Sequence, residues 1–240
     1  MISKNELKYI QSLCQKKQRA AEGVFMAEGP KLAEELMASD YKIIRGYATT
    51  SWLAENKTGK GFTEVSEIEL EKMTGMQTAN QVILIVEQKV QKILPDLSKK
   101  LSLVLDGIQD PGNLGTIIRI ADWFGITQIV ASEDTVDLYN PKVVQSTMGS
   151  FIRVPVYYTD IVGFLTATKL TVYGAMLEGK SMQELEKPST GLLVIGNESK
   201  GIRLTVQPLI KQAITIPRWG GAESLNAAVA TGILVSHMKG

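Results

Sequence analysis

The sequence predicts an α/β protein of two domains, the second of which is a doubly wound parallel sheet. The chain has 240 residues, a length that suits two domains of ordinary size. Apolar runs alternate with helix-like segments through most of the chain, as βαβ units require. The apolar runs after residue 100 are almost continuous, which is typical of parallel strands buried on both faces. These three observations indicate the fold class.

The first domain is expected to span residues 1–95. Its first segment has apolar residues at helical spacing, and the basic segment that follows is expected to be a loop. Short β-like runs then alternate with helix-like stretches, one of which has proline at its first position. The expected helices are 3–17, 30–37 and 67–73, the expected loop is 16–23, and the expected strands are 24–26, 43–47, 62–65 and 82–86.

The second domain is expected to span residues 96–240, after a linker at 89–100 that contains Pro95 and several lysines. In doubly wound sheets, ligands collect beyond the carboxyl ends of the strands. The expected strands are 101–108, 128–132, 170–176, 191–196 and 213–217, and the expected helices are 116–123, 141–146, 161–168 and 224–238.

Composition excludes several functional classes. The chain has one cysteine, Cys14, and one histidine, His237, so it cannot form a disulfide framework or a Cys/His zinc site. A Ser-His-Asp triad would have to use His237 near the C-terminus. The net charge of +1 means that nucleic-acid binding would depend on local basic patches. No signal-peptide pattern and no apolar run of about 20 residues is present, so a reduced, cytoplasmic location is expected.

The first motif follows the first strand of the second domain, at residues 106–119. Asn113 offers a cap for a helix that is expected to begin near Thr116. With that start, Asn113, Gly115 and Arg119 would face one site, where the helix N-terminus offers free N–H groups to an anionic or polar ligand. As a glycine-rich turn this motif is weakly specific, and it lacks the G-x-G-x-x-G spacing of a dinucleotide site.

The second motif, at residues 194–202, runs from a buried strand into a glycine. Gly196 would allow a ligand close to the backbone because it has no side chain. Glu198 is either functional or simply stabilises a helix dipole.

The third motif, at residues 214–230, is a strand end, a flexible loop and an alanine-rich helix. Ser224 is a natural cap for this helix, so capping competes with a functional role for Ser224 and Asn226. The alanines indicate close packing of the helix; they are Ala227, Ala228 and Ala230.

In this order, the three motifs resemble those of the SpoU/TrmH family within the SPOUT class of RNA methyltransferases. They read N-x-G-x-x-x-R from Asn113, I-G-N-E-x-x-G from Ile195, and I-P-x-x-G-x-x-x-S-L-N-x-x-V-A from Ile216. The stretch 140–149 looks like the family's segment that ends in Ser-x-Gly. Residues 25–32 are similar to part of the family's substrate-binding domain, a small α/β/α domain that resembles ribosomal RNA-binding proteins.

The resemblance implies a deep trefoil knot in the second domain and a homodimer whose active site is completed across the interface. It implies transfer of a methyl group from S-adenosyl-L-methionine to a ribose 2'-hydroxyl of structured RNA, with ribosomal RNA favoured over transfer RNA and no metal. The knot loops would hold the cofactor, through Gly196, Asn197, Ile216, Gly220 and Leu225.

By the same resemblance, Arg119 is the central catalytic residue. Arginine stays protonated in proteins, with a pKa above about 12, so a phosphate clamp that stabilises the developing alkoxide is favoured over a general base. Asn113 and Glu198 would orient Arg119, and Ser224 and Asn226 would contact the RNA phosphate or the cofactor.

The front domain offers a basic cluster for RNA, although a solvated surface patch would look the same in sequence. The cluster is Lys16, Lys17 and Arg19.

The chain departs from the family pattern at five positions, which leaves the RNA target open. They are Arg218 for methionine, Ala227-Ala228 for Val-Ser, Thr147 for serine and Gln145 for arginine. A non-catalytic RNA-binding protein is the alternative function, although retention of all five catalytic candidates argues against it. A nucleotide-dependent oxidoreductase would need the missing G-x-G-x-x-G element.

Overall fold

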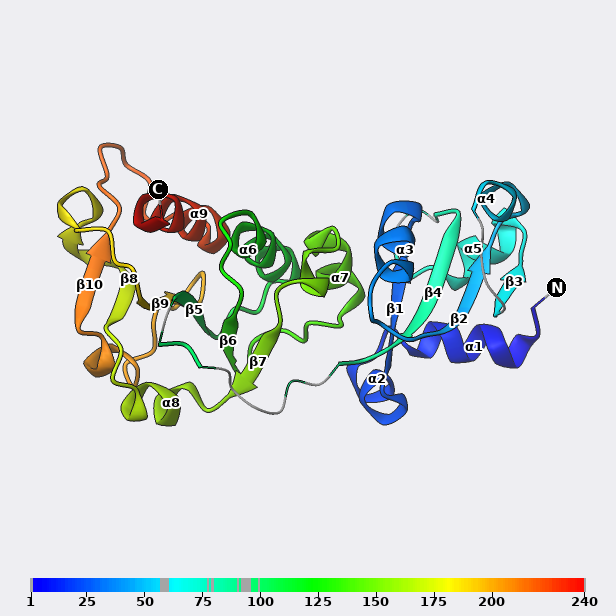
Figure 1. Cartoon of the computed structure of the whole chain (residues 1–240), viewed down its shortest axis with the longest axis horizontal. Helices are drawn as coiled ribbons and strands as arrows, with labels where there is room; N and C mark the ends of the chain where they lie inside the picture. The colour runs from blue at the N-terminus through cyan, green and yellow to red at the C-terminus, as the bar shows by residue number, and fades with distance from the viewer. Residues whose placement is uncertain are drawn as a thin grey trace. The chain divides into compact units, whose positions relative to one another are not determined.

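The computed structural model describes residues 2–56, 61–76, 78, 80–89, 91, 96–98 and 100–239 (Figure 1). The chain divides into two compact units: unit 1 is Met1–Val90 with Asp137–Ile152, and unit 2 is Gln91–Val136 with Arg153–Gly240. Half of the expected linker (residues 90, 92–95 and 99) and the expected boundary at residue 95 lie outside the described residues. The assignment of 1–95 and 96–240 as functional domains therefore stays a prediction.

Unit 1 contains a four-stranded sheet in the order β1-β4-β2-β3. β4 is antiparallel to both of its neighbours, and β2 and β3 are parallel. The four strands confirm the four that the sequence predicts. They are β1 (Val24–Glu28), β2 (Ile43–Ala48), β3 (Phe62–Glu64) and β4 (Val82–Glu87).

The helices of unit 1 follow local capping signals. Ser66 and Glu69 form a capping box at the start of α5, and α3 begins with Pro30 at its first position. The expected loop at 16–23 is wrong, because residues 16–22 form a helix that ends at Gly23 in the left-handed conformation (φ 64°). The helices are α1 (Lys4–Ser12), α2 (Lys16–Glu22), α3 (Pro30–Met37), α4 (Thr50–Glu55), which the sequence did not predict, and α5 (Glu67–Met73).

The core of unit 1 forms where α1 and α5 cover one face of the sheet. Ile10 of α1 and Leu70 of α5 are fully buried there against alternate residues of β1 and β4 and against β2, because successive side chains of a strand point to opposite faces. The strand residues in this cluster are Val24, Met26, Tyr47, Ile83 and Ile85.

Residues 137–152 belong to unit 1 by their contacts, although the sequence places them in the second domain. They form α7 (Pro141–Thr147) and a short 3-10 helix (Ser150–Ile152). Tyr139 stacks on Phe25 of β1 with ring centroids 4.5 Å apart, and Phe151 meets Phe25 edge-on. The Tyr139 hydroxyl also accepts a hydrogen bond from the Lys89 amide at 2.9 Å. These buried aromatic contacts explain why residues 137–152 belong to unit 1.

Unit 2 contains a six-stranded sheet in the order β10-β8-β9-β5-β6-β7, and every neighbouring pair is parallel. This confirms the predicted parallel sheet. The strands are β5 (Leu101–Asp106), β6 (Ile129–Ser132), β7 (Val156–Thr159), which the sequence did not predict, β8 (Val172–Ser181), β9 (Gly191–Gly196) and β10 (Gln212–Thr215).

Helices cover both faces of this sheet (Figure 1). One face packs on α8 (Ile161–Ala167) through Val104, Val194 and Ile161. The other face carries α6 (Pro111–Trp123) and α9 (Ala227–Lys239), which contact each other. The remaining 3-10 helices are Met182–Glu184 and Gln207–Leu209. No helix among the described residues is long and apolar enough to span a membrane.

Candidate active site

The first motif begins its helix five residues earlier than the sequence predicts. Asp110, not Asn113, is the N-cap of α6, and its Oδ1 accepts a hydrogen bond from the Asn113 amide at 2.8 Å. The predicted start near Thr116 is therefore wrong. Asn113 and Arg119 lie six residues apart in one helix, so at about 100° per residue they point about 120° apart. Gly115 and Arg119, four residues apart, do share a face.

The side chain of Asn113, which does not cap the helix, connects the three motifs. Its Nδ2 donates to Glu198 Oε1 at 2.7 Å, and its Oδ1 accepts from Asn226 Nδ2 at 2.8 Å. Asn113 is buried, as amides with such partners can be. Segments about 85 and 113 residues away in sequence thus meet at one side chain.

Asn226 caps the last helix, so the prediction that Ser224 is the cap is wrong. Its Oδ1 accepts hydrogen bonds from the amides of Ala228 (2.9 Å) and Val229 (3.2 Å). α9 therefore begins at Ala227, and Ser224 lies exposed in the preceding loop with no hydrogen bond in the described part of the chain. The Asn226 amide group orients Asn113 and starts α9 at the same time.

The loop after β9 is held by Asn197. The Asn197 side chain donates to Gly107 O at 2.8 Å and accepts from the amides of Ser199 and Lys200 at 3.0 and 3.2 Å. Its backbone N–H and C=O both pair with Gly201. Asn197 therefore organises the loop that carries Glu198, and its own polar groups are all engaged.

Gly196 is required by the chain itself. A Cβ at this position would lie 2.6 Å from Gly201 O and closer still to Gly201 C and Ile202 N. The sequence predicts close approach of a ligand at Gly196, but the structure places the 201–202 backbone there.

An ion pair that the sequence did not predict fixes the segment that follows Gly201. Asp106, at the end of β5, has a fully buried side chain that accepts from both the backbone amide (2.8 Å) and Nε of Arg203. A hydrogen bond from Ser132 and then the charge of Arg203 hold the pKa of the nearby Asp134 carboxyl below its usual value. The sequence did contain a signal for this ion pair, the carboxylate of Asp106 at the end of an apolar run. A charge that is buried with such a run needs a partner of opposite charge.

Arg119 is exposed, and within the described part of the chain it makes no hydrogen bond or ion pair. The expectation that Asn113 and Glu198 orient Arg119 is not met here, because Asn113 and Glu198 bond each other instead. The site therefore contains three hydrogen-bonded side chains, those of Glu198, Asn113 and Asn226. The guanidinium of Arg119 lies on the same helix as Asn113, α6, and takes no part in these bonds.

The residues predicted to hold a cofactor lie at the ends of β9 and β10 and before α9. Ile216 is half-buried and Leu225 is 46% exposed. At Gly220 a Cβ would meet nothing within 4 Å, so there is open space beside this backbone. Among the described residues, no group of three or more His, Cys, Asp or Glu side chains is placed to hold a metal ion.

The predicted basic cluster is divided by the structure. Lys16 and Lys17 are exposed on α2, but Arg19 is only 1% exposed. Arg19 Nη2 lies 2.6 Å from Asp137 Oδ2, and its Nη1 donates to the carbonyls of Leu13 and Cys14 at 2.9 Å. The assignment of Arg19 as an RNA contact is wrong, because its guanidinium is buried with protein partners.

Comparison with known proteins identifies the class. A protein of the TrmH family of RNA methyltransferases from Porphyromonas gingivalis has a TM-score of 0.89 and 34% identity, over 100% of this chain and 98% of that one. An AdoMet-bound rRNA methyltransferase from Sinorhizobium meliloti has a TM-score of 0.87 and 30% identity, over 99% and 96%. The fold is thus that of RNA methyltransferases.

The family follows from the sequence comparisons. The SpoU rRNA methylase family model matches residues 100–236, and the MRM3-like substrate binding domain matches residues 4–84. The 23S rRNA (guanosine(2553)-2'-O)-methyltransferase RlmP of Bacillus subtilis is 32% identical over 94% of this chain and 92% of its own length. The chain belongs to the SpoU rRNA methylase family.

Proposed function

We propose that this chain transfers a methyl group from S-adenosyl-L-methionine to a ribose 2'-hydroxyl of 23S ribosomal RNA. The observation that carries the proposal is the pair of hydrogen bonds that link Glu198, Asn113 and Asn226. These bonds join all three family motifs, and Asn113 lies in the same helix as Arg119. RlmP, similar over nearly the whole chain, is named as a 23S rRNA 2'-O-methyltransferase. Residues 1–95 would be the RNA substrate-binding domain and residues 96–240 the catalytic domain. The cytoplasm, where ribosomal RNA is found, would be its location.

The donor set fits a cofactor that is bound mainly by apolar contact and backbone groups. Ile216 and Leu225 offer partly exposed apolar side chains, and Gly220 leaves its backbone accessible. Gly196 and Asn197 would contribute indirectly, by fixing the loop that ends in Gly201. When bound, S-adenosyl-L-methionine supplies a methyl group already activated by its positive sulfur.

The protein residues then have two tasks, to position the ribose and to stabilise charge on its oxygen. Arg119 carries a fixed positive charge with a planar fork of donors, so it would bind a phosphate and stabilise the developing 2'-alkoxide. Ser224 exposes a hydroxyl two residues before Asn226 and would contact the RNA. Asn113 and Glu198 act as positioning residues, because their hydrogen bonds fix the first turn of α6 against the 198 loop.

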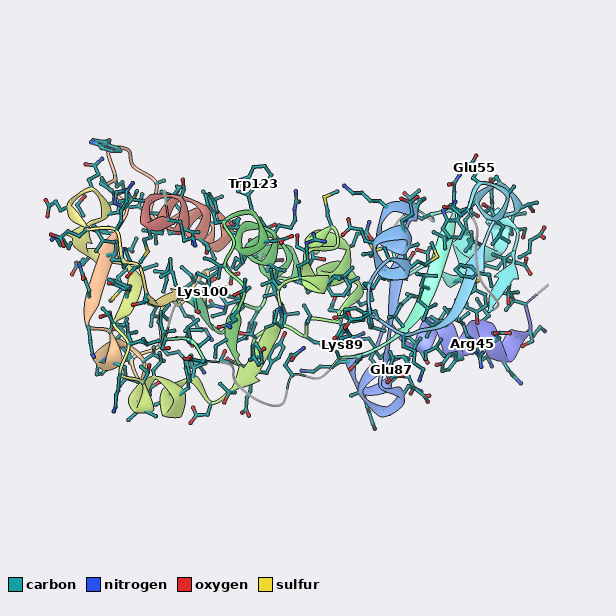
Figure 2. The ribbon with its side chains drawn as sticks, viewed as in Figure 1. Arg45, Glu55, Glu87, Lys89, Lys100 and Trp123 are labelled. Carbon is teal, nitrogen blue, oxygen red and sulfur yellow. The ribbon has the colours of Figure 1, made fainter. Side chains whose placement is uncertain are left out.

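A homodimer and a trefoil knot complete the proposal. Exposed apolar side chains on α6 and next to or on α9 support a second copy as partner: Trp123 is 84% exposed, Val229 51% and Leu225 46%. Figure 2 shows Trp123 pointing outward from α6. The trefoil knot is proposed from the resemblance to the family alone, since knots are rare exceptions to the rules of chain connection.

Mapping of 2'-O-methyl groups tests the function. Deleting the gene should remove a 2'-O-methyl mark from 23S rRNA, and the purified protein with S-adenosyl-L-methionine should restore it on RNA from the deletion strain. RNA binding without methyl transfer would favour the non-catalytic alternative. Calorimetric titration separates the third class, since an oxidoreductase would bind NAD in preference to S-adenosyl-L-methionine.

The two exposed lysines of α2 are expected to contribute to RNA affinity. Replacing Lys16 and Lys17 together by alanine should lower the salt slope of RNA binding by about two, since each phosphate contact contributes about one unit. Filter binding at several salt concentrations measures the slope. Lys169→Ala, which removes an exposed cation in unit 2, is the control. An unchanged slope in the double variant would remove both lysines from the RNA interface.

A further inference from the structure

The loop between β10 and α9 presents an exposed aromatic side chain, Trp219. Trp219 is 86% exposed, the most exposed large apolar side chain among the described residues. Figure 1 shows this loop extending away from the sheet between β10 and α9. An indole in water is unfavourable, and an exposed aromatic of this kind often marks a binding surface.

Both ends of the loop are held by hydrogen bonds, and one of the two ends lies at the candidate active site. Thr215 Oγ1 donates to Leu177 O at 2.9 Å at one end, and Asn226 bonds Asn113 at the other. Within the loop, Arg218 Nη1 donates to Ala222 O at 3.1 Å and closes a turn around Trp219. Trp219 follows Ile216 by three residues, so their Cα atoms are at most about 11 Å apart. The backbone of Trp219 therefore lies near Ile216, one of the residues assigned to the cofactor.

The surroundings of Trp219 favour RNA over a second copy of the chain. Its exposed neighbours are an arginine and two glycines, Arg218, Gly220 and Gly221, followed by the acidic Glu223. This is a single aromatic ring in a polar loop, whereas Trp123 and Val229 lie on neighbouring helices that contact each other. Unpaired RNA bases stack on such isolated rings, and a neighbouring guanidinium suits the phosphate backbone.

We propose that Trp219 is a stacking platform for an unpaired base of the substrate RNA, next to the nucleotide that is methylated. This proposal rests on the proposed function for the identity of the ligand as RNA. It assigns a role in substrate selection to a variable position of the third motif, between Pro217 and Gly220.

Tryptophan fluorescence tests the contact directly. The chain has three tryptophans, of which Trp52 is buried, so the exposed ones report on bound RNA. Deproteinised total RNA from a strain that lacks the gene is the probe, because it contains every target unmodified. RNA should quench the fluorescence of the wild type and of Trp123→Phe, the matched control, and the quenching should be much smaller in Trp219→Phe.

Affinity for the same RNA separates stacking from apolar contact. Trp219→Ala should weaken binding by about 5- to 150-fold, the range found for losing one stacked base. Trp219→Leu keeps apolar area without a ring and should lose nearly as much, whereas Trp219→Phe should recover most of the affinity. The cofactor dissociation constant, measured by calorimetry, should not change in any of the three.

Three results would overturn the proposal. Equal quenching in the wild type and Trp219→Phe would show that no base meets this ring. A lower sedimentation mass for Trp219→Ala would identify a second copy as its partner, and weaker cofactor binding would make it part of the cofactor site. Because the quenching does not require methyl transfer, failure of the proposed function would be seen separately, as binding and quenching without methylation.

Discussion

Arg119→Ala is expected to abolish methyl transfer while leaving cofactor binding nearly intact. Arg119 is exposed and has no protein partner in the described part of the chain, so its loss should not destabilise the fold. Removing a donor that stabilises transition-state charge typically costs about 10²- to 10³-fold in rate, and loss of the phosphate clamp adds to this. Single-turnover methylation of 23S rRNA measures the rate, and calorimetry measures binding of S-adenosyl-L-methionine.

Arg119→Lys separates a clamp from a general base. Lysine keeps the positive charge but loses the planar fork, so a clamp should retain part of the activity. A general base at this position would instead give a rate that rises with pH through the lysine pKa. Lys211→Ala, which removes another exposed cation of unit 2, should methylate at the wild-type rate. Ordinary turnover in Arg119→Ala would show that the catalytic centre has been misassigned.

The sequence predicted the sheets well because strand burial leaves a local signal. β5 is buried along its whole length and β9 at all but its last residue, and both were expected within two residues of their observed ends. The short β7 was missed because three of its four residues are only partly buried or exposed, which weakens the apolar pattern. Local patterns thus predict fully buried strands better than partly exposed ones.

The helix starts could not be predicted because several residues compete for each cap. Asp110 and Asn113 are both good caps, as are Ser224 and Asn226, and local propensity does not choose between them. Tertiary contacts decide which residue becomes the cap. Asn113 lies inside the first turn of α6, where its side chain bonds Glu198 and Asn226. The error changed which side chains were expected to share a face.

The burial of Arg19 was equally beyond a local reading. Its partner, Asp137, lies 118 residues away, in a segment expected to belong to the other domain. A charge among lysines is usually solvated, and only the long-range ion pair and two carbonyl acceptors make this arginine an interior residue. The site motifs were found because the residues of each motif follow one another at fixed, short spacings. Arg19 and Asp137 are 118 residues apart and form no local pattern.

Gly196→Ala is expected to be the most damaging single methyl addition in unit 2. The new Cβ would meet the backbone of Gly201 and Ile202, which side-chain rotation cannot relieve. Overpacking of a core costs about 1–3 kcal/mol when side chains can adjust, so a clash with backbone should cost at least the upper end of that range. The segment cannot move freely, because Arg203 is held by the buried Asp106. Soluble yield and urea unfolding measured by circular dichroism should both fall sharply.

Two other glycines distinguish a clash from the general effect of replacing glycine. Gly220→Ala meets nothing within 4 Å and should unfold like the wild type. Gly201→Ala also has open space but sits at φ 67°, so it should lose only about 1–2 kcal/mol from left-handed strain. If Gly196→Ala unfolded no earlier than Gly201→Ala, the 201–202 backbone could not lie against Gly196, and the loop carrying Glu198 would need a different path. The order Gly196, Gly201, Gly220 in decreasing damage therefore tests how the chain builds the wall of the candidate site.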